Sequence, residues 1–161
     1  MKAILTLSKK FFPAHFRSGE ETNFKEKLLR GEKIHTCRMN YWYWSNKISR
    51  IIDSDGVLSI RQWSDKPYRS PQEIVKDIPA YIVGVQKLKL TRYLETRAVV
   101  FYASVDGESV SIEDLARNDG LTQKEFEAWF NPTFDKEAKN FLNPKNITLT
   151  FAIIHFTKQR Y

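Results

Sequence analysis

Gly31-Glu32-Lys33-Ile34-His35-Thr36-Cys37-Arg38 is the stretch from which the fold of this chain can be worked out. It brings a glycine, a lysine, a hydroxyl group and an arginine together in a short segment. Upstream, Ser18 and Glu21 stand at capping-box spacing, and apolar residues recur four apart, so a helix is expected over about residues 19–30. Gly31 then lies where a helix C-terminus favours positive φ. The stretch therefore begins as the chain leaves a helix.

From about Ile34 the chain is expected to be extended. Side chains alternate between the two faces of a strand, so Thr36 and Arg38 should share one face while His35 and Cys37 point the other way. Lys33 can act together with Thr36 only if it still belongs to the turn. The direction in which Lys33 points is therefore the main question that the sequence leaves to the structure.

Composition limits the class of protein. A chain of 161 residues, 42% hydrophobic and 14% aromatic, is expected to form a single domain over 1–161. It has one cysteine, which excludes an internal disulfide and a cysteine-rich zinc site. The first apolar run is too short for a signal peptide, and no stretch approaches the length of a membrane helix. We expect a soluble, cytoplasmic protein without membrane contact; the sequence does not indicate its oligomeric state.

Charge is distributed unevenly. The formal net charge is +7; residues 1–70 contain 14 Lys and Arg against 7 Asp and Glu, whereas residues 99–137 contain 3 against 9. Such asymmetry indicates a basic face that can meet phosphates. The alternative is that these are ordinary solvated charges.

The remaining elements predict the fold class. Strands are expected at 3–7, 57–63, 81–90, 97–105 and 147–156, and helices from Tyr41 to about Ile51, after Ser111 and after Thr122. The strand at 97–105 is almost continuously apolar and is expected to be central, and 131–146 is expected to be a polar connection with Pro132 and Pro144. Without regular βαβ alternation, this pattern predicts an α+β domain with a mostly antiparallel, barrel-like sheet and three to four short flanking helices.

Aromatic and basic residues outside the opening stretch are candidates for ligand contact. Trp42 is left over from the apolar face of its helix, and Arg61, Trp63, Tyr68 and Arg69 form a second cluster. Aromatic faces can stack on nucleobases and arginines can bind phosphates. The alternative is that Trp42 covers the edge of a core and that the arginines pack on aromatic rings as ordinary surface.

The pattern Gly31-x-Lys33-x-x-Thr36-x-Arg38 resembles the G-x-K-x-x-T-x-R signature of the ASCH domain, a branch of the PUA-like superfamily. The preceding helix, the two helices around Asp119 and the closing strand are similar to the order of elements in that family. Segments 39–56, 61–81 and 131–146 then look like additions to a minimal ASCH core.

This resemblance implies a small β-barrel with a cleft for RNA or a nucleotide-derived ligand. One branch of the family removes the acetyl group from N4-acetylcytidine with a lysine, a threonine and a glutamate. Lys33 and Thr36 match the first two by motif position. The third would fall on Asp119, where this chain has the shorter acid.

The chemistry of these side chains can be judged independently of the resemblance. A threonine hydroxyl needs a base beside it to act as a nucleophile, and a lysine serves as that base only if burial or a nearby cation such as Arg38 lowers its pKa. A carboxylate at Asp119 would orient the ammonium group or a water molecule. Each residue also has an ordinary role, because Asp119 suits a turn and Thr36 suits a strand.

Three hypotheses follow. The first is a binding module that holds RNA or a modified nucleoside in a cleft next to the motif, with Arg38, His35, Trp42, Arg61, Trp63, Tyr68 and Arg69 as ligand-binding residues. The second is an amidohydrolase on an acylated nucleoside, or a ribonuclease, that uses Lys33, Thr36 and Asp119. The third is a protein-interaction domain. The histidines are too scattered to predict a metal site, and no cofactor is expected.

Overall fold

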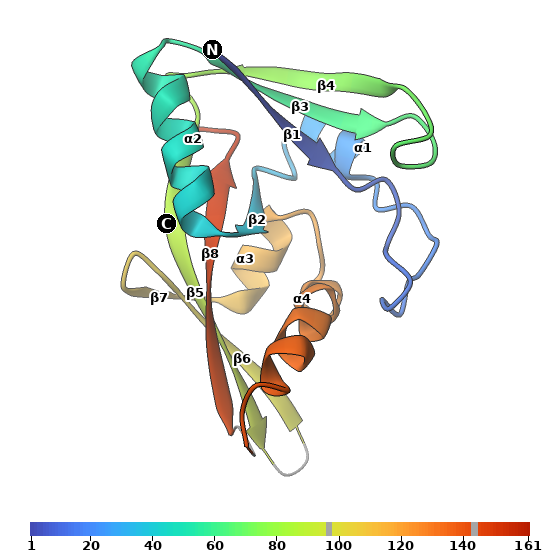
Figure 1. Ribbon diagram of the computed structural model, residues 1–161, viewed down its shortest axis with the longest axis vertical. Helices are drawn as coiled ribbons and strands as arrows, with labels where there is room; N and C mark the ends of the chain where they lie inside the picture. The colour runs from blue at the N-terminus through green and yellow to red at the C-terminus, as the bar shows by residue number, and fades with distance from the viewer. Residues whose placement is uncertain (96–97, 143–144) are drawn as a thin grey trace.

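The computed structural model describes residues 1–95, 98–142 and 145–161 (Figure 1). The strands within these residues are β1 (Lys2–Leu7), β2 (His35–Met39), β3 (Val57–Trp63), β4 (Gln72–Pro79), β5 (Gly84–Glu95), β6 (Ala98–Val105), β7 (Glu108–Val110) and β8 (Asn146–His155). The helices are α1 (Phe24–Leu29), α2 (Tyr41–Asp53), α3 (Ile112–Asn118) and α4 (Gln123–Ala138).

The strands form two sheets. The first has the order β1-β3-β4, with β1 parallel to β3 and β3 antiparallel to β4. The second has the order β2-β8-β5-β6-β7 and is antiparallel throughout. The α+β class with mostly antiparallel strands is therefore confirmed. The closed barrel is not: in the described part of the chain the short strands β2 and β7 end the second sheet, and neither pairs with β1 or β4.

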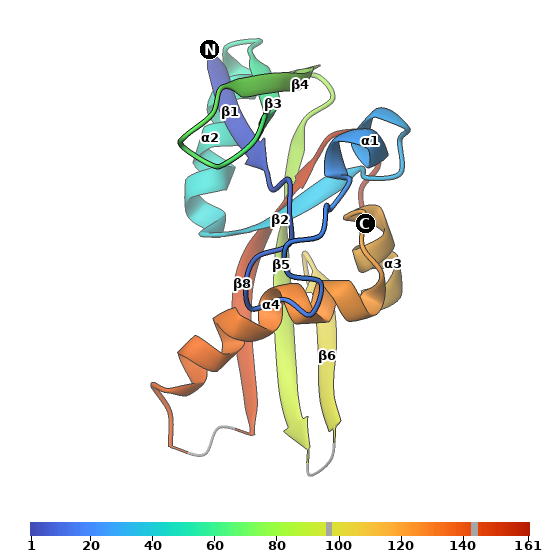
Figure 2. The same ribbon diagram turned by 90° about the vertical axis from the view of Figure 1, so that its right-hand side faces the viewer.

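Helices cover both sides of the long strands. Figures 1 and 2 show α2 and α4 on opposite sides of the second sheet, and both helices contact β8. The half of β8 from Phe151 to His155 is accordingly buried at every position. None of the described helices is long and apolar enough to cross a bilayer.

The segment before α1 differs from the expectation. The helix begins at Phe24 rather than near residue 19, and its N-cap is Asn23. Residues 19–22 instead pair with the chain just after β1: Phe11 N–H donates to Glu20 O, and Thr22 N–H donates to Lys9 O. The helix end is as expected, because Gly31 has a φ of 78°. Tertiary hydrogen bonds thus replaced the first turn that the capping-box spacing predicted.

The expectations for α4 and β6 also need correction. The connection expected at 131–146 is helical as far as Ala138, with Pro132 inside α4, because Phe134 is fully buried beyond the proline. Pro144 lies outside the described residues. The strand expected at 97–105 is β6, with Arg97 outside the described residues; it lies next to the edge strand β7 rather than at the centre of the sheet. Val99 and Tyr102 of this strand are exposed.

Candidate functional site

Lys33 points into the protein, toward Asp119. Its side chain is 1% exposed and forms an ion pair with Asp119 Oδ1. The same ammonium donates to the backbone carbonyl of Asp119 at 2.6 Å, and it lies 4.1 Å from the centre of the Phe24 ring. Lys33 thus has two oxygen acceptors and one aromatic face, and it does not point into water.

The turn after α3 makes this approach feasible. Asp119 is the C-cap of α3, and Gly120 follows with a φ of 80°. A Cβ atom on Gly120 would lie 3.2 Å from Lys33 Cβ, closer than most such contacts. Ile34 N–H donates to Asn118 O at 2.8 Å and fixes the turn against the start of β2. The positive φ and the close approach both require glycine at this position.

Burial sets the electrostatics of the pair. Loss of water lowers the pKa of Lys33 and raises the pKa of Asp119, while their mutual attraction opposes both changes. Burial also raises the pKa of the Cys37 thiol well above its ordinary value, so Cys37 is a protonated thiol at neutral pH. Asp119 thus keeps Lys33 as its ion-pair partner, and Arg38 is a second cation close to it.

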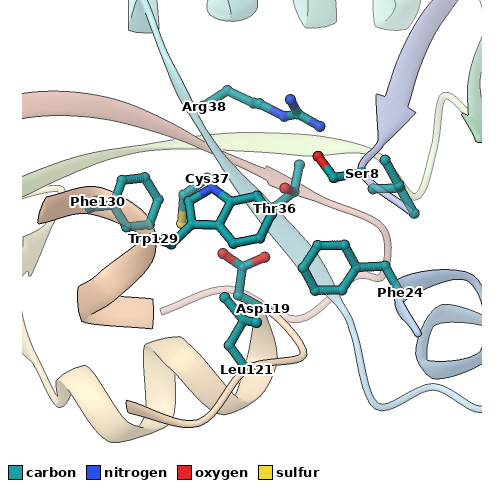
Figure 3. Close-up of a pocket in the computed structure, with 10 residues that line it drawn as sticks. Ser8, Phe24, Thr36, Cys37, Arg38, Asp119, Leu121, Trp129 and Phe130 are labelled. Carbon is teal, nitrogen blue, oxygen red and sulfur yellow. The ribbon is translucent and has the colours of Figure 1, made fainter. Parts of the chain in front are cut away.

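A small inner cavity of about 30 Å³ lies next to the pair. Thr36 and Arg38 of β2 and Asp119 line it, together with Cys37, Leu7, Ser8, Phe24, Leu121, Trp129 and Phe130. Figure 3 shows the Asp119 carboxylate and the Thr36 hydroxyl facing this space from different elements. Lys33 does not line it and reaches it through Asp119. The structure therefore joins all three expected catalytic residues in one cluster, with room for about two water molecules beside them.

A larger outer cleft of about 630 Å³ shares Leu7, Ser8 and Arg38 with the inner cavity. Its lining contains four cationic side chains, from Arg38, Lys9, Lys10 and Lys66, and three aromatic rings, from Phe12, Trp63 and Tyr68. The Trp63 and Tyr68 rings lie 5.1 Å apart. Asp65 is the acidic residue of the lining. The cleft is therefore both basic and aromatic, and it meets the motif at Arg38.

The other expected ligand-binding residues lie elsewhere. His35 is fully buried, and its Nε2 hydrogen-bonds to the Tyr161 hydroxyl at 2.6 Å. Trp42 is 68% exposed on α2, and Arg61 Nε donates to Ser59 Oγ. Arg69 is exposed. These four residues line neither the inner cavity nor the outer cleft.

One group of side chains near the motif has the composition of a metal site. His35, Cys37 and Asp119 are buried and place ligand atoms within 4.8 Å of one another. Asp119 is already neutralised by Lys33, and burial favours the thiol form of Cys37 and neutral His35. A divalent ion would have to displace the ammonium or accept its repulsion, so these residues fit an ion pair better than a metal.

Sequence reasoning missed the residues directly after β1. Ser8, Lys9, Lys10 and Phe12 all line the outer cleft, and Lys9 Nζ donates to Ser64 O at 2.6 Å. Two lysines followed by two phenylalanines at the end of a strand were a usable signal. Their role depends on the parallel pairing of β1 with β3, which brings them beside Trp63.

Comparisons with known proteins give no further assignment. No protein-family model, curated protein or solved structure matches this chain.

Proposed function

We propose that this chain is an ASCH-type, PUA-like domain that binds RNA or a nucleotide-derived ligand in the outer cleft. The observation that carries the proposal is the lining of that cleft, in which four cations and three aromatic rings surround a space that ends at Arg38 of the motif. Cations bind phosphates without reading sequence, and aromatic rings stack on bases. The described part of the chain has two sheets where the resemblance implies one closed barrel.

The volumes of the two cavities support a ligand that lies mainly in the outer cleft. The outer cleft, at about 630 Å³, is within the range of small-molecule sites. The inner cavity, at about 30 Å³, is too small for a nucleobase. Base and sugar would then contact Trp63 and Tyr68, and only a small group would reach Thr36.

Single-stranded RNA binding, measured by fluorescence anisotropy, tests the proposal. Trp63→Ala is expected to weaken binding about 5-fold or more, since stacking on one aromatic ring contributes about 1–3 kcal/mol. Trp42→Ala removes an exposed tryptophan outside both cavities and should leave affinity unchanged. Affinity should fall as salt is raised, because bound phosphates release counterions. Equal effects of the two variants, or no binding by the wild type, would contradict the proposal and favour a protein-interaction domain.

A second candidate is hydrolysis of an acylated nucleoside or of RNA. The observation that favours it is that Thr36 and Asp119 face one small cavity while Lys33, with its pKa lowered by burial, contacts Asp119. Water would add across the scissile bond, and Lys33 and Asp119 would transfer its proton to the leaving group. Mass spectrometry of N4-acetylcytidine and RNA after incubation tests it: wild type should release acetate or cleave the RNA, and Thr36→Val should not. If both substrates stay unchanged, hydrolysis is contradicted and only the binding function remains.

A further inference from the structure

The guanidinium group of Arg38 lies at the junction of the two cavities and has an unused donor. Arg38 lines both the inner cavity and the outer cleft. Its Nη2 donates to the Thr6 carbonyl at 2.5 Å, which fixes the plane of the group. Its Nε is buried and has no hydrogen-bond partner among the residues that the structure describes. Arg92 also has a buried and unpaired Nε, but of these two arginines only Arg38 lines both cavities.

The groups around Arg38 favour an anion. The Ser8 and Thr36 hydroxyls line the same inner cavity, and Figure 3 shows them on its Arg38 side. Lys9 and Lys10 follow Ser8 into the outer cleft. Asp119 is the carboxylate that lines the inner cavity, and Lys33 neutralises it. A negatively charged group at the junction would therefore meet a local excess of positive charge together with hydroxyl donors.

We propose that Arg38, Ser8 and Thr36 form a subsite for a terminal phosphate group of the ligand. The site rests on the proposed function for the cleft whose inner end it occupies. A guanidinium group presents several N–H donors in one plane and suits phosphate oxygens, and hydroxyl groups can donate to the remaining oxygens. The base and sugar then extend toward Trp63 and Tyr68.

The size of the inner cavity limits what can lie behind Arg38. Behind Arg38 the space is about 30 Å³, and Asp119, Trp129 and Phe130 line it. One phosphate oxygen can enter such a space, but a further nucleotide cannot. A terminal phosphate keeps three unbridged oxygens for Arg38, Ser8 and Thr36, whereas an internal phosphodiester keeps only two, so the subsite suits a nucleotide or an RNA with a phosphorylated end.

The test compares three short RNAs of one sequence that carry a 5′-phosphate, a 3′-phosphate or hydroxyl groups at both ends. Isothermal titration calorimetry should show at least 10-fold tighter binding of one phosphorylated form than of the hydroxyl-ended RNA. Arg38→Gln should remove that gain, so that the phosphorylated and the hydroxyl-ended RNAs bind this variant with equal affinity. Arg38→Lys keeps the charge without the planar fork and should retain only part of the gain. Arg61→Gln, a cation outside both cavities, is the matched control and should retain all of it.

The outcomes separate this subsite from the proposed function. Equal affinity for all three RNAs would overturn the terminal-phosphate subsite and leave RNA binding in place. A gain that persists in Arg38→Gln would place the phosphate elsewhere and overturn the role of Arg38. Absence of binding to any of the RNAs would overturn the proposed function itself. If Arg38→Gln does not fold, two measurements still test the subsite. They are the affinities of the wild type for the three RNAs and the affinities of Arg38→Lys for the same RNAs.

Discussion

Lys33 and Asp119 are separated by 86 positions in the chain and meet in a fully buried ion pair. Taking both charges out of water costs free energy, which the pair recovers only through its mutual attraction and the additional bond to the Asp119 carbonyl. Removal of either side chain is therefore expected to lower the stability of the protein. The pair holds the Asp119 carboxylate at the inner cavity, which Thr36 also lines.

Lys33→Met is expected to lower the free energy of unfolding by about 3–5 kcal/mol, because it leaves a buried carboxylate without a partner. Urea denaturation measures this loss. The double variant Lys33→Met/Asp119→Leu should recover most of it, since apolar side chains can replace both charges. Lys2→Met, which removes an exposed ion pair with Asp77, is the control and should change stability little. A loss for Lys33→Met no larger than for Lys2→Met would show that the pair is not buried in solution.

At the scale of elements, α4 shows how packing can extend a helix beyond a proline. Proline removes one backbone hydrogen bond and disfavours a helix interior. Thr122 and Glu125 form a complete capping box at the start of α4. Beyond Pro132, Phe134 is fully buried and packs 5.4 Å from the Phe101 ring, measured between centroids. The helix therefore continues because its second half covers the sheet.

Phe134→Ala is expected to destabilise the protein by about 3–5 kcal/mol, through lost apolar burial and the cavity that remains. Phe141→Ala is the matched control, because Phe141 is 58% exposed and its removal should cost less than about 0.5 kcal/mol. Thermal and urea unfolding followed by circular dichroism give both values. Similar values for the two variants would mean that the second half of α4 does not pack on the sheet.

At the scale of the whole molecule, buried histidines link folding to pH. His155 lies at the end of β8 opposite His35 of β2, and its Nε2 hydrogen-bonds to Gln86 of β5 at 2.9 Å. Burial, with the nearby Arg160 as a smaller cause, lowers the pKa of His155 to about 4. Burial also lowers the pKa of His35 well below its ordinary value. Both imidazoles are therefore neutral in the folded protein at pH values where they are protonated in the unfolded chain.

The unfolded state thus binds more protons than the folded state between about pH 6.5 and pH 4, so stability falls as pH falls through this window. For His155 alone the loss between pH 7 and pH 5 is about 2 kcal/mol. His155→Gln should lose less stability than wild type over this interval by about that amount, measured by urea denaturation at each pH. Parallel curves for the two proteins would contradict the lowered pKa of His155.

Features set by neighbouring residues could be predicted from the sequence. Features set by contacts between distant elements could not. Local patterns were sufficient for the strand Val57–Trp63 and for the helices that begin after Ser111 and Thr122. They were insufficient for the start of α1, the end of α4 and the position of β6, which depend on contacts with other elements. Both faces of β2 are covered by other elements, because His35, Thr36 and Cys37 are all buried.

The sequence by itself determined the α+β class and the turn at Gly31, because periodicity and turn chemistry act over a few residues, whereas the candidate trio of Lys33, Thr36 and Asp119 came from the resemblance to the ASCH signature. Only the tertiary structure decided that Lys33 faces Asp119 instead of water, since that requires the turn at Gly120 to lie against residue 33. It also decided which aromatic and basic residues line one cleft. Trp63 and Tyr68 meet Lys9 and Arg38 there, whereas Trp42 and Arg61 do not, because the pairing of β1 with β3 sets which side chains share a surface.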